Sequence, residues 1–134
     1  AGTGGQLLIG FDLKKDPEVL HRAYNDAAGM TAAFNLNLLV RLNRELAADF
    51  DPARFRHYAF YHPVAGRIEM HLVSLAEQTV SVAGKRFHFT LGETLHTENS
   101  YKFRCEEFSE IARSAGWRLK DEWAQGGFAV QLYA

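Results

Sequence analysis

The sequence predicts an α+β fold built from helices and an antiparallel sheet. Three observations support this prediction. Apolar residues recur at helical spacing over residues 16–46, they alternate with polar residues over residues 55–91, and a last helical segment precedes two alternating segments within residues 103–132. Helices and strands that are grouped in this way, rather than alternating regularly, are typical of α+β proteins.

The first element is a short strand, Leu7–Phe11, which follows the glycine-rich residues 1–5. Its nearly continuous apolar character is typical of a parallel strand that is covered on both faces. The following sequence supplies no crossover helices leading to parallel neighbours, so we expect the partners of this strand to lie upstream of residue 1. The glycines precede a strand instead of following one, and we therefore do not expect them to cradle a phosphate or a cofactor.

Two helices are predicted next. Asp16 and Pro17 form a start signal, and apolar residues then recur at helical spacing until Gly29. Thr31 is placed to cap the second helix. Its apolar stripe is Phe34, Leu38, Leu42 and Leu46, with Asn35, Asn37, Arg41 and Arg44 off the stripe. A short turn is expected at Asp51-Pro52.

A sheet with one solvated face follows. Ile68, Met70 and Leu72 alternate with Glu69 and His71, and Phe87, Phe89 and Leu91 alternate with Arg86, His88 and Thr90. Turns are expected at residues 63–66, at residues 76–77 and at residues 83–84.

The chain closes with a helix and two strands. Glu106 and Glu107 suit a first helical turn, and Gly116 suits the position just after the last turn. Alternating segments then run from Trp117 to Trp123 and from Phe128 to Leu132, separated by Gly126 and Gly127.

Charge and composition favour a small-molecule partner. The 134 residues contain 15 Lys and Arg against 16 Asp and Glu, so the chain lacks the basic excess that nucleic acid or an anionic membrane attracts. Cys105 is the only cysteine, which excludes an internal disulfide and suggests a reducing compartment. No apolar run is long enough to span a bilayer. We expect a cytoplasmic protein with no nucleic-acid or membrane partner.

Five histidines lie in the β-rich stretch, as in a cupin-like metal centre: His57, His62, His71, His88 and His96. His71 and His88 fall on the polar phase of their strands, so both are expected to face solvent rather than a shared interior. We therefore expect no metal site.

Two polar segments are candidates for binding. Residues 97–102 read as either a solvated loop or part of a pocket, and residues 23–31 as either helix capping around a core tyrosine or part of a site. The residue pattern leaves both alternatives open.

A family resemblance bears on these segments. Residues 8–16 (LIGFDLKKD), 23–29 (AYNDAAG), 34–39 (FNLNLL), 67–70 (RIEM) and 97–102 (TENSYK) resemble the bacterial L-histidine Nα-methyltransferases of ergothioneine biosynthesis, in the same order and at similar spacing. The resemblance covers essentially the whole chain. It implies an S-adenosylmethionine-dependent enzyme that trimethylates the α-amino group of L-histidine to hercynine.

The resemblance also implies a domain organisation. Residues 1–13 would hold a late strand of a Rossmann-like methyltransferase domain, residues 14–102 a histidine-binding domain, and residues 103–134 the closing helix and β-hairpin of the methyltransferase domain. Counterparts of the family's cofactor loop and acidic ribose-binding residue are missing. We therefore expect a C-terminal fragment that is inactive alone, with the S-adenosylmethionine site in the missing N-terminal half.

Site residues follow from the same resemblance. Tyr24 would hold the substrate carboxylate, Glu98 and Ser100 would bind the imidazole, and Thr31 and Met70 would line the pocket. No residue is expected to act as a covalent catalyst. The alternative is a noncatalytic β-rich module that binds a small molecule or a cupin-like metal. The exposed edge of the first strand is expected to favour self-association.

Overall fold

The computed structural model describes residues 4–134, so the first three residues of the glycine-rich start lie outside it. Helices and antiparallel strands form separate segments, which confirms the α+β class. The chain divides into two compact units. One contains the residues up to Asp16, Pro63–Arg67 and Tyr101–Ala134, and the other contains Pro17–His62 and Ile68–Ser100.

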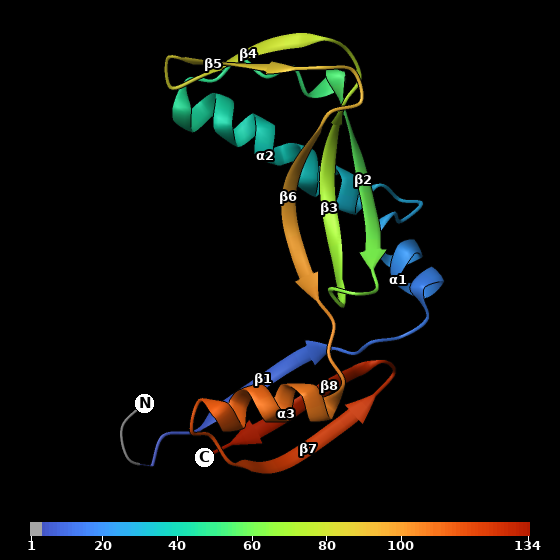
Figure 1. Cartoon of the computed structure of the whole chain (residues 1–134), viewed down its shortest axis with the longest axis vertical. Coiled ribbons are helices and arrows are strands. Elements are labelled where there is room, and N and C mark those ends of the chain that lie inside the picture. The colour runs from blue at the N-terminus through green and yellow to red at the C-terminus, as the bar shows by residue number, and fades with distance from the viewer. Residues whose placement is uncertain (1–3) are drawn as a thin grey trace. The chain divides into compact units, whose positions relative to one another are not determined.

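The first unit contains a three-stranded sheet and one helix. The strands β1 (Leu7–Asp12), β7 (Leu119–Gln125) and β8 (Phe128–Tyr133) pair antiparallel in the order β1-β8-β7. Helix α3 (Cys105–Ser114) packs on one face, where the ring of Phe108 stacks on Phe11 at 4.5 Å between ring centroids (Figure 1).

The pairing of β1 corrects one prediction. β1 has a partner within the chain, because it runs antiparallel to β8 with Gly10 opposite Val130. The expectation that its partners lie upstream of residue 1 is therefore wrong for this neighbour, while the other edge of β1 has no partner strand within residues 4–134. Its apolar residues indicated burial, which carries no information about strand direction; even so, Leu8 is 65% exposed.

The buried face of β8 is largely polar. Ala129, Gln131 and Tyr133 face the interior, while Phe128 is exposed. The side chains of Gln131 and Tyr133 avoid the cost of unsatisfied buried polar groups, because they form hydrogen bonds to each other and to α3. The Gln131 amide donates to Ser109 Oγ at 3.1 Å and the Tyr133 hydroxyl donates to Gln131 Oε1.

The long segment between β1 and α3 begins and ends at neighbouring residues of this unit. Leu13 forms a parallel bridge with Phe103, and the Phe103 amide donates to the Asp12 carbonyl at 3.2 Å. The ammonium of Lys102, whose side chain is 1% exposed, lies 3.0 Å from the Asp12 carboxylate, which also pairs with Lys15 at 2.7 Å. Burial alone would raise the pKa of Asp12, but the hydrogen bonds from these two lysines outweigh it and lower that pKa.

The second unit combines helices with a three-stranded sheet. Its elements are α1 (Pro17–Tyr24), α2 (Met30–Leu46), a 3₁₀ turn η1 (Pro52–Arg54), β2 (Phe55–His62), β3 (Arg67–Ser74), β4 (Gln78–Val82), β5 (Lys85–Phe89) and β6 (Thr94–Tyr101). The sheet order is β2-β3-β6, and β4 and β5 form an antiparallel hairpin (Figure 1). The predicted turns at residues 63–66, 76–77 and 83–84 are confirmed.

Helix α1 ends at Tyr24, earlier than the predicted end at Gly29. The side-chain amide of Asn25 donates to the carbonyls of His21 and Ala59, and the next residue, Asp26, turns to the amides of α2. These side-chain bonds compete with continuation of the helix.

Helix α2 buries a different face from the predicted stripe. Asn35 and Leu39 are its buried residues, whereas Phe34 is 66% exposed. Leu39 joins a core with Phe50, Phe55, Leu72, Val80 and Phe89. The polar run at residues 97–101 is part of strand β6 and not a loop. None of the helices in residues 4–134 is long and apolar enough to cross a bilayer.

Candidate functional site

The five residues expected to bind substrate all belong to the second unit. Tyr24 is the last residue of α1 and Thr31 the second residue of α2. Met70 lies on β3, and Glu98 and Ser100 lie on β6. Elements that are distant in sequence therefore contribute these residues to the same unit.

Tyr24, Ser100 and Met70 are brought together. The Tyr24 hydroxyl donates a hydrogen bond to Ser100 Oγ at 2.7 Å in a partly buried position. Met70 is 2% exposed and belongs to a core cluster with Ala59 and other apolar residues, against which the Tyr24 ring packs. The apolar part of Tyr24 is thus fixed by packing, and its hydroxyl is aimed at β6.

Two residues that the sequence did not single out for the site hold the backbone of Tyr24. Asn35, which is 2% exposed, donates through Nδ2 to the His71 carbonyl at 3.1 Å and lies 3.0 Å from His57 Nδ1. Because that amide nitrogen can only donate, His57 Nδ1 accepts. His57 Nε2 therefore carries the proton and donates to the Tyr24 carbonyl at 2.8 Å. The burial of Asn35 depends on these tertiary contacts, so no local sequence signal identifies this network.

Thr31 is held by Asp26 and does not cap α2 as predicted. The helix begins after Gly29, whose φ of 71° is left-handed. Asp26 accepts from the amides of Met30 and Thr31, each at 2.9 Å, so its carboxylate satisfies two free amides of the first turn. Hydrogen bonds from the Thr31 side chain and amide lower the pKa of Asp26 to about 2.

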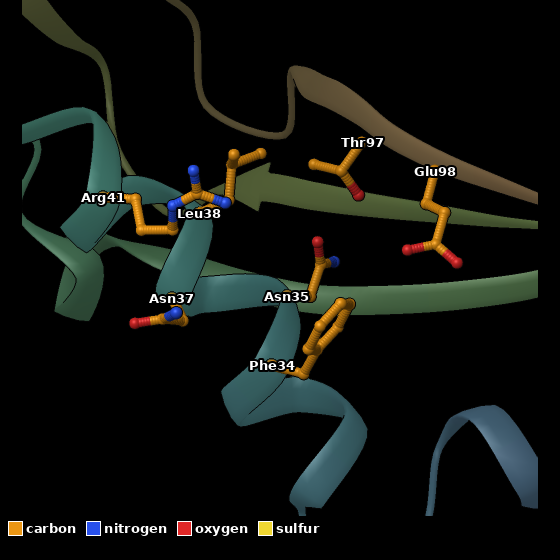
Figure 2. Close-up of a pocket in the computed structure, with 7 residues that line it drawn as sticks. All are labelled: Phe34, Asn35, Asn37, Leu38, Arg41, Thr97 and Glu98. Carbon is orange, nitrogen blue, oxygen red and sulfur yellow. The ribbon is translucent and has the colours of Figure 1, made fainter. Parts of the chain in front are cut away.

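Glu98 lines a small cavity of about 140 Å³ between α2 and β6. Thr97 lines it as well, and its hydroxyl donates to the Met70 carbonyl at 2.9 Å. The remaining lining residues come from α2, and Figure 2 shows their side chains: Phe34, Asn35, Asn37, Leu38 and Arg41. Two residues of the predicted core stripe, the exposed Phe34 and the partly buried Leu38, are therefore cavity walls.

The structure does not gather all five predicted residues around this cavity. Tyr24, Thr31, Met70 and Ser100 are not among its lining residues. The cavity offers a carboxylate at Glu98, a guanidinium at Arg41 and an aromatic wall at Phe34. These groups suit a small polar molecule that carries both N–H donors and a flat or apolar part.

The histidines do not all face solvent. His88 has a side chain that is 54% exposed, as predicted. The side chain of His71 is only 12% exposed, so the prediction that it faces solvent is wrong. It stacks between the rings of Phe60 and His96, at 5.5 and 4.5 Å between centroids. Aromatic residues on both neighbouring strands cover it.

Comparison with known proteins gives consistent matches. The model of a family described as histidine-specific methyltransferase, SAM-dependent, matches residues 1–134. A histidine N-alpha-methyltransferase of Mycolicibacterium smegmatis is 45% identical over 96% of this chain, and one of Mycobacterium tuberculosis is 41% identical over 98%. Ergothioneine biosynthesis protein 1 of Neurospora crassa is 26% identical over 99%. The chain spans 41%, 42% and 15% of the lengths of these three relatives.

Proposed function

Because the chain belongs to the family of histidine-specific, S-adenosylmethionine-dependent methyltransferases, we propose that it is the substrate-binding part of an enzyme that trimethylates the α-amino group of L-histidine to hercynine in ergothioneine biosynthesis. The observation that supports this most is identity of 41–45% to two named histidine N-alpha-methyltransferases across nearly the whole chain.

Two parts of the chain fit two roles in such an enzyme. We assign residues 14–102 to histidine binding, and residues up to 13 and 103–134 to the edge of a Rossmann-like methyltransferase domain. The bridge between Leu13 and Phe103 supports this division, because a segment inserted into a sheet domain must leave and return at neighbouring points. We also assign a cytoplasmic location, which the single cysteine, Cys105, supports.

The described residues do not fit S-adenosylmethionine. A cofactor loop of the Rossmann type follows a strand, contains glycine and opens a helix. The strand-to-helix links in residues 4–134 are residues 13–16 between β1 and α1 and residues 102–104 between β6 and α3, and neither contains glycine. The cofactor would supply the methyl group, and we assign no residue of this chain to it.

Tyr24 and Ser100 are proposed to bind opposite ends of histidine. In the structure the Tyr24 hydroxyl is committed to Ser100. A substrate carboxylate can only accept hydrogen bonds, so it would accept one from the Tyr24 hydroxyl. The Ser100 hydroxyl would then be available to bind the imidazole together with Glu98. Binding thus exchanges one internal hydrogen bond for two to the substrate.

Thr31 and Met70 are proposed to form the walls of the site. Asp26 fixes Thr31, and the core cluster fixes Met70, so neither requires reordering when the substrate binds. Methyl transfer to an amine requires the neutral nitrogen to be aligned and shielded from water, so the contribution of these residues is positioning and exclusion of water. Covalent catalysis is not required.

Replacement of Glu98 tests the proposed function. In the complete methyltransferase that we propose contains this chain, Glu98→Ala should lower kcat/KM for histidine by at least about tenfold, since a hydrogen bond to a charged group contributes about 1.5–3 kcal/mol. Asn99→Ala is the matched control, because Asn99 is the next residue of β6 and is likewise exposed. An unchanged kcat/KM for Glu98→Ala would contradict the assignment of Glu98. The 134-residue chain alone should transfer no methyl group.

A further inference from the structure

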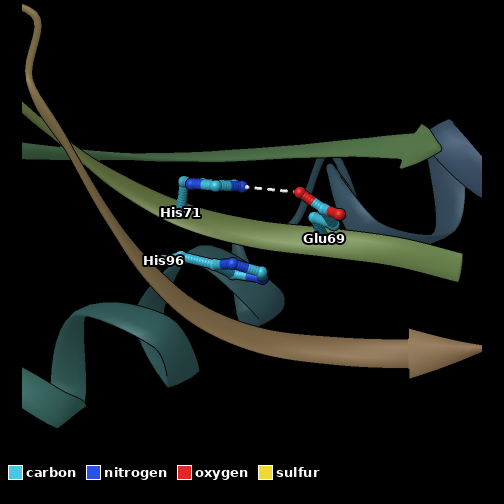
Figure 3. Close-up of side chains that lie close together, drawn as sticks. All are labelled: Glu69, His71 and His96. Carbon is cyan, nitrogen blue, oxygen red and sulfur yellow. Dashed lines mark hydrogen bonds and ion pairs between the residues drawn. The ribbon is translucent and has the colours of Figure 1, made fainter. Parts of the chain in front are cut away.

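On the second unit's sheet, three potential metal ligands meet on the face opposite Met70. Glu69 and His71 alternate with Ile68, Met70 and Leu72 along β3, so they project from the other side of the sheet. His96 projects from the neighbouring strand β6, and Figure 3 shows its ring lying beside that of His71. None of these three residues has a role in the proposed methyl transfer.

The donor atoms are close enough for one ion. A ring nitrogen of His71, a ring nitrogen of His96 and a carboxylate oxygen of Glu69 all lie within 4.8 Å of one another. Ligands of a tetrahedral zinc ion are roughly 3.3 Å apart, given metal–ligand distances of about 2.0–2.1 Å. His96 is exposed, so its side chain can rotate by the amount needed to close that gap.

One ring nitrogen of His71 has no hydrogen-bond partner among the described residues. Nε2 lies 3.3 Å from Glu69 Oε2 and, in the absence of an ion, donates to that carboxylate. A metal ion bound between Nε2 and Glu69 would replace this proton, which metal binding releases. Nδ1 is buried and accepts no hydrogen bond from residues 4–134, so the metal-free arrangement leaves a buried polar atom unsatisfied.

The surroundings favour a fixed site over a chance contact. The side chains of Glu69 and His71 are 10% and 12% exposed, and the rings of Phe60 and His96 enclose His71 on both sides. His96 Nε2 lies 3.2 Å from the Glu98 carbonyl, which can only accept, so Nε2 carries a proton and Nδ1 is the nitrogen of His96 that can face an ion.

We propose that Glu69, His71 and His96 form a binding site for a divalent transition-metal ion, zinc by its ligand set. Two imidazoles and one carboxylate, with water in the fourth position, are a common zinc environment. The ion would tie β3 to β6, the two strands that carry Met70, Glu98 and Ser100. The proposal does not depend on the proposed methyltransferase function.

Metal titration of the untagged protein tests the site. After chelation and dialysis, the protein should bind one equivalent of Zn²⁺ from ZnCl₂, bind Co²⁺ with the visible absorption of a tetrahedral site, and unfold at a higher temperature with Zn²⁺ than without it. His96→Ala should weaken Zn²⁺ binding by at least about tenfold, because it removes a ligand. His96 is exposed, so this variant should keep its circular dichroism spectrum.

His88→Ala is the matched control. His88 is an exposed strand histidine in the same unit and outside the cluster, so its loss should leave zinc affinity unchanged. The proposal is overturned if the protein binds no stoichiometric Zn²⁺, if His96→Ala binds as tightly as the parent, or if His88→Ala lowers the affinity as much as His96→Ala. A water molecule alone would then satisfy His71 Nδ1.

Discussion

The hydroxyl of Tyr24 donates a hydrogen bond to Oγ of Ser100 at 2.7 Å, across 76 residues of sequence. This contact joins the end of α1 to β6. In the proposed function, both hydroxyls form hydrogen bonds to the substrate instead when it binds. It is therefore a contact of the ligand-free protein, with its own measurable energy.

A double-mutant cycle measures that energy. Tyr24→Phe and Ser100→Ala should each lower the free energy of unfolding. The double variant should lower it by less than the sum of the two single changes. The expected coupling is about 0.5–1.5 kcal/mol, the usual value of a neutral hydrogen bond. Chemical denaturation of the four proteins gives this coupling. Strictly additive losses would mean that the two hydroxyls do not interact in solution.

Substrate selection should depend on Glu98 and Met70 together. In the complete methyltransferase, Glu98→Leu combined with Met70→Val should lower kcat/KM for histidine and raise kcat/KM for phenylalanine, since the pair removes a carboxylate that an apolar ring would leave unpaired and enlarges the site. Glu98→Gln, which keeps shape and loses charge, should be intermediate for histidine. If phenylalanine remains a nonsubstrate while histidine use falls, Glu98 binds histidine without excluding aromatic amino acids.

The cap at Asp26 should make the stability of α2 depend on pH. The pKa of Asp26 in the folded chain is lowered from 3.8 to about 2. A lowered pKa means that the stabilisation is present above pH 3.8 and is lost as pH falls through about 2. Asp26→Ala should lower the Tm at neutral pH and flatten its dependence on pH in this window. Asp121→Ala, at an exposed position of β7, serves as control and should do neither.

The ion pair at the chain crossing should contribute to stability in the first unit. Lys102→Met leaves Asp12 without its buried partner and should lower the free energy of unfolding by about 1–3 kcal/mol. This is small for a broken buried pair, because Asp12 is 30% exposed and keeps its contact with Lys15. Lys15→Met removes a more exposed partner and should cost less. Equal losses from both variants, measured by denaturant unfolding, would contradict the dominant role of Lys102.

The outer edge of β1 should promote association of the chain. β1 is an edge of the β1-β8-β7 sheet within residues 4–134, and it offers unpaired backbone groups. Light scattering should detect dimers or larger species, and Leu8→Lys should reduce them, because a charged residue at an edge opposes strand pairing. A monomer at high concentration would count against this prediction.

Sequence reasoning worked where local signals decide structure. The period of two in Ile68, Met70 and Leu72 identified a strand, and Gly116, with a φ of 86°, follows the last helix as predicted. It failed where a tertiary contact decides between faces. Asn35 is buried because it can bond both His57 and the His71 carbonyl, which a hydrophobicity pattern cannot reveal.

The same reason limits the prediction of the site. The family resemblance supplied Tyr24, Thr31, Met70, Glu98 and Ser100, and the structure confirms none of their roles, although it places all five in one unit. The cluster around His71 was missed because strand alternation assigns a residue to a face of the sheet. Whether that face is covered depends on Phe60 and His96, which lie on other strands.

The bridge between Leu13 and Phe103 has a consequence for how such proteins diversify. A long segment whose two ends are already joined adds little closure entropy to the sheet that hosts it, since that cost grows only slowly with length. The residues of the second unit, Pro17–His62 and Ile68–Ser100, can therefore change in length or sequence while β1, β8 and α3 keep their register. If the second unit binds substrate as we propose, such changes would alter substrate preference while the Asp12–Lys102 pair stays as the fixed point of attachment.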